Sequence, residues 1–245
     1  MVRLLTAAIL TAAWPGLLGA QPRTRLSPES SRAFDDYTKA VETALDFEAH
    51  IRLDRPGVNM VPGAAKPTVD LPDAIIHDWA AAVLIPGTTL GKTMTLLQSY
   101  DDYKRIYAGQ ITDSKALGHE GGLWHIYLKL YKKAIFTANL DTEHDVEYRR
   151  IDAARWGILS RTTKVAEVED SRAQPVGTGH GFLWRLNAYW VLEQRPEGVY
   201  AECRAISLSR NVPLGLGWAL KPLVTRLPRE SLRDTLEDTV RALAK

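Results

Sequence analysis

The sequence predicts an α+β fold in which a long run of antiparallel strands is followed by one amphipathic helix. Between Gln110 and Ser209 the chain is rich in aromatic and β-branched residues, in segments separated by turn residues, which is typical of strands. The last segment, Arg229–Ala244, places Leu232, Leu236 and further apolar residues on one narrow stripe. A helix with a single apolar stripe that follows strands has to bury that stripe on the sheet.

The first part of the chain is expected to add helices and one strand. Ser27 is a suitable N-cap residue with Pro28 at the first helical position. A β-branched, apolar run is stopped by Pro86 and Gly87. The elements expected here are a helix from Ser27 to about Phe47, a Pro/Gly-rich loop over 57–72, a strand over Ala74–Ile85, and two short helices between Thr89 and Tyr107.

About six consecutive strands are expected next, which with Ala74–Ile85 gives a curved antiparallel sheet of about seven. The clearest signal is Gly181–Glu193, where apolar and polar residues alternate over the whole segment. A loop is expected over 210–228, before the last helix. The expected strands are Gln110–Leu117, Leu123–Leu130, Ala134–Glu143 with Tyr148–Ile151, Trp156–Val168, Gly181–Glu193 and Val199–Ser209.

The N-terminus has the pattern of a secretory signal peptide. Arg3 precedes an apolar run over Leu4–Ala13, and small residues lead up to Ala20. The alternative is a short membrane anchor, but the run is short for a bilayer and contains Pro15. We therefore expect cleavage near Ala20 and export, so that the protein is periplasmic or secreted. The expected organisation is a signal peptide over 1–20, a helix and linker over 21–72, and one domain over 73–245.

Composition limits the classes of partner. The 245 residues include 31 Lys plus Arg and 29 Asp plus Glu, a net charge of +2. Nucleic acid is not expected as a partner, because it requires a concentrated basic surface. Cys203 is the only cysteine, so no disulfide can form within the chain, and no histidine pair has the i, i+4 spacing of a helical zinc site. We expect no metal and no cofactor, and assign no catalytic residue.

The order of elements resembles that of the START-like superfamily, also called the polyketide cyclase and lipid-transport (SRPBCC) group. Some stretches also resemble an uncharacterised bacterial subgroup of it. That resemblance implies the helix-grip fold, in which a curved sheet wraps a long C-terminal helix, and the binding of lipids, sterols, polyketides or other apolar molecules. Only some members are enzymes, so the fold does not decide the activity. The stretches are His77–Trp79 with Ile85–Gly87, Asn139–Val146, Gly179–Trp190 and Val212–Leu232.

Several polar residues are candidates for contact with such a ligand. His77 and Trp79 open the first strand, where it would meet the mouth of a cavity. Arg185 and Arg204 would bind a carboxylate or phosphate if their strand faces line the cavity, or form weak cross-strand ion pairs if those faces meet water. His144 beside Asp145 would be a general base, or part of a polar turn that satisfies its own backbone.

Tryptophans and one apolar loop complete the candidate site. Aromatic residues at period two are typical of a core, and in a helix-grip fold the core also surrounds the cavity. The loop over 213–223 is almost wholly apolar with basic residues beside it. It would form a lid, contact a membrane surface, or pack flat on the core. The candidate ligand-binding residues are His77, Trp79, Trp184, Arg185, Trp190, Arg204, Leu214, Leu216 and Trp218.

Three functions follow as hypotheses. The first is an exported carrier or sensor for an apolar small molecule or lipid held between the sheet and the last helix. The second is a cyclase, dehydratase or hydrolase that uses the same cavity, with His77, His144 or Arg185 acting in it. The third is a structural or interaction protein whose cavity is filled by side chains.

Overall fold

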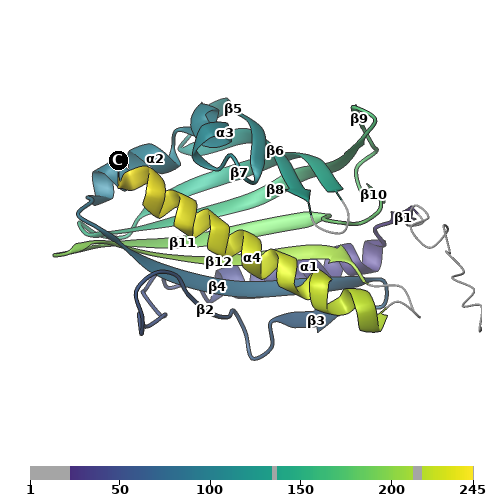
Figure 1. The fold of residues 1–245 in the computed structure, drawn as a ribbon, viewed down its shortest axis with the longest axis horizontal. Coiled ribbons are helices and arrows are strands. Elements are labelled where there is room, and N and C mark those ends of the chain that lie inside the picture. Colours follow the sequence, from purple (N-terminus) through teal and green to yellow (C-terminus); the bar gives the residue numbers. More distant parts are fainter. Residues whose placement is uncertain (1–22, 134–136, 212–216, 245) are drawn as a thin grey trace, which may run out of the picture.

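The computed structural model describes residues 23–133, 137–211 and 217–244, with side chains of the last stretch from Arg226 onward. Its centre is a strongly curved antiparallel sheet in the order β2-β4-β12-β11-β8-β7-β6-β5 (Figure 1). The strands are β2 (Asn59–Pro62), β4 (Ala74–Pro86), β5 (Ile111–Glu120), β6 (Leu123–Lys133), β7 (Thr137–Arg150), β8 (Arg155–Glu169), β11 (Arg185–Arg195) and β12 (Gly198–Arg210). Shorter strands are β1 (Thr24–Arg25), β3 (Thr68–Asp70), β9 (Arg172–Ala173) and β10 (Thr178–Gly179).

The long C-terminal helix α4 (Gly217–Leu243) crosses the inner, concave face of the sheet diagonally (Figure 1). Its apolar stripe is buried there, with Leu232 at 5% and Leu236 at 0% exposure. This confirms the α+β, helix-grip fold expected from the sequence. The expected start at Arg229 is wrong, because the helix begins twelve residues earlier and continues through two prolines. The prolines disfavour a helix in this stretch, and contacts between α4 and β4 stabilise it.

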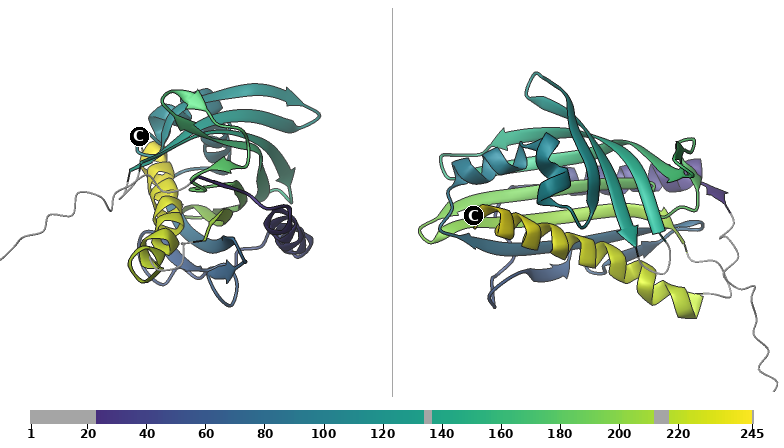
Figure 2. Two further views of the ribbon diagram at one scale, coloured as in Figure 1. Left: turned by 90° about the vertical axis from the view of Figure 1, so that its right-hand side faces the viewer. Right: turned by 45° about the horizontal axis from the view of Figure 1, so that its top comes forward.

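Helix α1 (Pro28–Thr43) packs on the opposite, outer face of the sheet, so the sheet lies between α1 and α4 (Figure 2). Ser27 caps the helix by accepting a hydrogen bond from the Ser30 amide. The helix ends at Thr43, before the expected Phe47. Phe47 has a left-handed backbone conformation, and its ring lies against Gly157 on the outer face of the sheet. A Cβ at Gly157 would lie 2.2 Å from that ring, so only glycine fits there.

The expected loop over 57–72 contains two short strands, β2 and β3, which both pair with β4. Strand β4 is buried on both faces for most of its length, because α4 lies against its inner face and α1 with the segment after it lies against its outer face. This burial explains its nearly continuous apolar sequence. Strand β7 is also continuous where the sequence indicated an interruption. A register shift between Glu143 and His144 accommodates the irregular pattern without ending the strand.

Three short helices close one end of the inner face. They are α2 (Leu90–Leu97), η1 (Tyr100–Asp102) and α3 (Tyr103–Ile106), in the region where the sequence predicted two short helices. Thr89 caps α2 by accepting from the Lys92 amide. Within the ranges that the structure describes, no helix combines the length and apolar character needed to cross a bilayer.

Candidate functional site: a cavity between the sheet and α4

A cavity of about 410 Å³ lies between the inner face of the sheet and α4. This volume is within the range of sites for small molecules. Most of its lining is aliphatic or aromatic, and the described residues that line it include no Asp or Glu. The sheet contributes mainly Ile126, Leu128, Leu130, Leu140, Val146, Ile158, Leu186, Ala188, Trp190, Cys203 and Ala205, and α4 contributes Leu227, Pro228, Ser231, Leu232 and Thr235.

One end of the cavity is formed by tyrosines whose hydroxyl groups already have partners. The Tyr100 and Tyr148 hydroxyls lie 2.5 Å apart, and those of Tyr148 and Tyr103 both donate to the Leu97 carbonyl, at 2.9 and 2.6 Å. The Tyr107 hydroxyl is 3.1 Å from Thr239 Oγ1, and burial raises the pKa of Tyr107 to about 12. This tyrosine end therefore offers rings rather than free polar groups.

His144 supplies a polar position on the wall of the cavity. It lies within β7, so the expected polar turn at His144–Asp145 is wrong. The two side chains point to opposite faces because strand residues alternate: Asp145 pairs with the exposed His125 at 2.6 Å, whereas His144 is buried and lines the cavity. Burial lowers the pKa of His144 to about 4, so the ring is neutral at pH 7.

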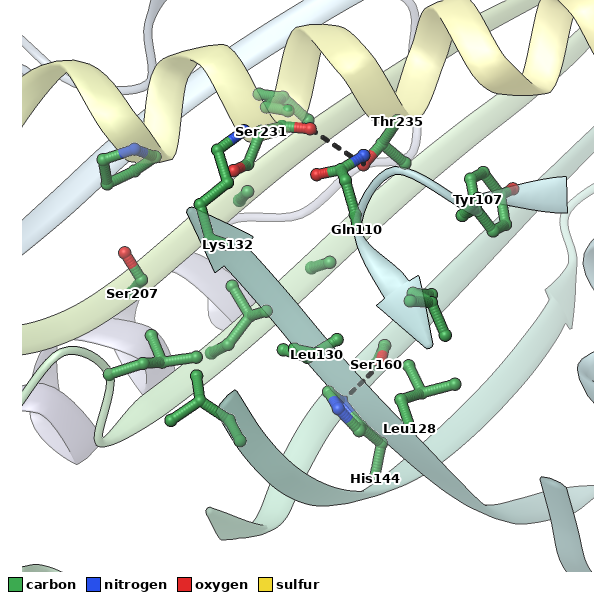
Figure 3. Close-up of a pocket in the computed structure, with 18 of the residues that line it drawn as sticks. Tyr107, Gln110, Leu128, Leu130, Lys132, His144, Ser160, Ser207, Ser231 and Thr235 are labelled. Atoms are coloured by element: carbon green, nitrogen blue, oxygen red, sulfur yellow. Dashed lines mark hydrogen bonds between the residues drawn. The ribbon is translucent and has the colours of Figure 1, made fainter. Parts of the chain in front are cut away.

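The His144 ring is held between two hydroxyl groups, of which Figure 3 shows that of Ser160. Thr142 Oγ1 lies 3.0 Å from Nε2, and Ser160 Oγ lies 3.4 Å from Nδ1. The second distance is beyond that of a good hydrogen bond. Ser160 also lines the cavity, so this weakly bonded pair faces the space a ligand would occupy.

His77 supplies a second polar position, on β4. Its ring is 1% exposed and lines the cavity. Nε2 lies 3.1 Å from Ser209 Oγ, and Nδ1 has no hydrogen-bond partner among the described residues. Burial lowers the pKa of His77 to about 4. Two neutral imidazoles thus face an otherwise mostly apolar cavity.

The loop over 180–183 forms the cavity wall at the end away from the tyrosines. Glu167, which is 4% exposed, holds this loop through three backbone amides. Its carboxylate accepts from His180 at 2.6 Å, Gly181 at 2.7 Å and Phe182 at 3.0 Å. A buried carboxylate satisfied by three N–H groups fixes the loop in place.

Among the described residues, Glu167, Glu169 and His180 bring three potential metal ligands within 4.8 Å of one another. The Glu167 oxygens are already used by the loop amides, and Arg23 forms an ion pair with Glu169. These contacts show that the three side chains hold the loop over 180–183 in place.

The structure distributes the sequence-derived candidates over both faces of the sheet. His77 and Trp190 line the cavity. Trp79 is on the inner face but lies under α4, where Arg229 stacks 5.5 Å from its ring centroid, and it is not part of the lining. Residues 213–216, which include Leu214 and Leu216, and the side chains of 217–223, which include Trp218, lie outside the described residues. The backbone of 217–223 belongs to α4 and not to the expected loop.

Trp184, Arg185 and Arg204 lie on the outer face and do not line the cavity. Trp184 precedes β11, so it does not share the face of Leu186 and Trp190 as the alternation suggested; it packs with Phe34 of α1. The polar strand faces do not line the cavity, because α1 and the chain that follows it cover them in part; the Arg185 and Arg204 side chains remain 30% and 25% exposed.

The two arginines form ion pairs on that covered face. Arg185 pairs with Asp35 of α1 at 2.9 Å. Arg204 forms two bonds to Asp78, at 2.9 and 2.5 Å, and Tyr37 donates to the same carboxylate at 2.7 Å. Their charges are therefore used to hold elements together.

Sequence reasoning missed the inward-facing hydroxyl groups. Ser160 and Ser207 lie on β8 and β12, and Tyr148 lies on β7, whereas Tyr100, Tyr103 and Tyr107 lie on or next to the short helices η1 and α3. They meet because the curved sheet brings its strands under these helices. For the strand residues, the signal that was present is their alternation with outward-facing residues.

No model of a known protein family matches the chain, and no curated protein sequence does. Solved structures with a similar arrangement of strands and helices include a Thermus thermophilus protein (TM-score 0.49, 14% identity, 68% of this chain and 97% of that one). Others are human STARD10 (0.48, 8%, 90% and 84%) and a STAR-related lipid transfer protein from Xanthomonas axonopodis (0.45, 15%, 75% and 98%). At these identities the likeness concerns the fold alone.

Proposed function

We propose that this protein is an exported carrier or sensor that holds an apolar small molecule or lipid in the cavity between the sheet and α4. The observation that carries the proposal is the 410 Å³ space with a mostly aliphatic and aromatic lining. A core filled by side chains, which a purely structural role would favour, leaves no such space. Apolar lining favours a ligand that gains free energy by leaving water.

The enzyme alternative has a specific observation in its favour, since the imidazoles of His77 and His144 face the cavity. Their lowered pKa values make both weak bases at neutral pH. In the part of the lining that the structure describes, no carboxylate is present to assist them. These properties suit hydrogen bonding to a ligand better than proton abstraction.

Binding can be tested with the fluorescent apolar probe N-phenyl-1-naphthylamine. Wild-type protein is expected to bind one equivalent, with micromolar affinity. Ala205→Leu adds three carbons to the cavity wall and is expected to weaken binding at least tenfold by occupying ligand space. Ala153→Leu, at an exposed position, is the matched control. Absence of probe binding, together with absence of any co-purifying ligand in native mass spectrometry, would contradict the proposal.

Export and contact with a membrane surface are further parts of this proposal. Their support is the N-terminal pattern and the apolar composition of residues 213–223. A carrier would load or release its ligand at a membrane, and a basic-edged apolar segment suits that contact.

A further inference from the structure

The polar groups of the cavity wall restrict the kind of ligand it accepts. The most informative is His144, because its surroundings determine which ring nitrogen carries the proton. Thr142 Oγ1 lies 2.9 Å from the Leu128 carbonyl oxygen, which can only accept, so the threonine hydroxyl donates there. Toward His144 Nε2, at 3.0 Å, the same oxygen can then only accept.

The proton of the neutral ring is consequently on Nε2, and Nδ1 carries a lone pair. Across from Nδ1 stands Ser160 Oγ, at 3.4 Å. If the serine hydroxyl turns toward Nδ1, its oxygen is left as the acceptor that faces the cavity. If it turns away, Nδ1 itself is the acceptor. In both arrangements the Ser160–His144 pair is completed by a hydrogen-bond donor.

The charges around the cavity argue against an ionic head group. The lining residues within the described ranges include no Asp or Glu, so an ammonium group would have no counter-charge among them. Two cationic side chains, Lys132 and Arg210, line the cavity. The Lys132 ammonium already pairs with Asp234 at 3.1 Å, and Arg210 lies five residues along β12 from Ala205, the residue in register with Ser160 through Ala188. A carboxylate next to Ser160 and His144 would face the Nδ1 lone pair.

We propose that the ligand is a neutral amphiphile with a hydroxyl group, which donates to the Ser160–His144 pair while the apolar body lies against the tyrosine end. This inference rests on the proposed binding function and specifies its ligand class. Figure 3 shows the pair on the wall beneath α4, facing the same space as Leu128 and Leu130. Thr142 is a positioning residue, because it acts only through the ring it orients.

The test is a competition assay with three ligands of equal chain length. Bound N-phenyl-1-naphthylamine is displaced by 1-decanol, decyl methyl ether or decanoate at pH 7.5. One good hydrogen bond predicts that the alcohol displaces the probe at about tenfold lower concentration than the ether. Decanoate is expected to displace the probe less effectively than the alcohol does.

Variants then locate the hydroxyl. Ser160→Ala is expected to bring the alcohol-to-ether ratio close to one while the probe still binds, which shows that the variant is folded. Thr142→Val is expected to reduce the ratio and to change the ring tautomer, observed by ¹⁵N NMR of the histidine nitrogens. In the wild-type protein that spectrum is expected to show His144 protonated on Nε2.

The outcomes separate this inference from the proposed function. Failure of wild-type protein to bind the probe contradicts the binding function itself. Probe binding with equal competition by alcohol and ether overturns the ligand class alone, as does preference for decanoate. Loss of the alcohol preference in Ser207→Ala but not in Ser160→Ala would place the hydroxyl near His77 and overturn the assignment. Protonation of His144 on Nδ1 instead of Nε2 would also overturn the assignment of the ligand hydroxyl to the Ser160–His144 pair.

Discussion

Single residues at the centre of the sheet show how strand alternation divides polar groups between two environments. His77 and Asp78 are neighbours on β4, yet one faces the cavity and the other is 1% exposed beneath α1. The Asp78 carboxylate pairs with Arg204 and accepts a hydrogen bond from the Tyr37 hydroxyl. Burial, together with that hydrogen bond, raises the pKa of Tyr37 to about 12. A Cβ at Gly63 would lie 1.9 Å from Asp78 Oδ1, so the Asp78–Arg204 ion pair leaves room only for glycine at position 63.

The buried histidines predict a loss of stability in acid. Their pKa values are lowered to about 4 in the folded protein and are about 6.5 when unfolded. Between these values the unfolded chain binds more protons, so the free energy of unfolding falls as the pH drops from about 6.5 to 4. Each histidine contributes about 3 kcal/mol over that window.

His144→Gln is expected to remove its share of this pH dependence, measured by urea unfolding at several pH values. The comparison is between slopes, because the substitution also lowers stability at neutral pH. His125→Gln, at an exposed position, is the control and is expected to keep the wild-type slope. An unchanged slope in His144→Gln would show that the ring is protonated in the folded state.

At the scale of elements, the N-terminal helix α1 is an integral layer of the fold. Phe34 is fully buried between α1 and the sheet, in a cluster with Ile206 and Leu208. Glu42 forms two bonds with Arg161 of β8, at 2.7 and 2.9 Å. The sequence predicted this helix from its cap and spacing, but it gave no sign of which surface the helix would cover.

Phe34→Ala is expected to lower the free energy of unfolding by about 3–5 kcal/mol, because it leaves a cavity in a close-packed cluster. Lys39→Ala, on the exposed side of the same helix, is expected to change it by less than about 0.5 kcal/mol. Chemical denaturation of both variants is the measurement. Equal, small effects would mean that α1 is a dispensable appendage.

At the scale of the whole molecule, both faces of the sheet are covered, and the cavity described above lies on the inner face. The outer face is filled by α1 and the segment after it, with Ile51 against Tyr200. On the inner face the sheet curves away from α4, and small residues such as Ala188 and Ala205 leave room beneath the helix. Curvature together with small side chains produces the cavity.

Export is a prediction for the whole chain. Expressed with its first 20 residues in a bacterial host, the protein is expected in the periplasmic fraction. Its mass is expected to be that of a chain that starts at Gln21. Replacement of Leu4 and Leu5 by Asp interrupts the apolar run and is expected to leave the full-length chain in the cytoplasm. An uncleaved, membrane-bound wild-type chain would instead support an anchor.

The sequence by itself determined the class of fold, the strand and helix order and most strand positions, because those depend on local periodicity. It also indicated the first helix and His77 as a cavity residue. Tertiary structure decided the early start of α4, the strand continuity at His144, and the placement of Arg185 and Arg204 beneath α1. These depend on which face each strand turns inward and on what covers the other, and both are set by contacts between segments far apart in the chain.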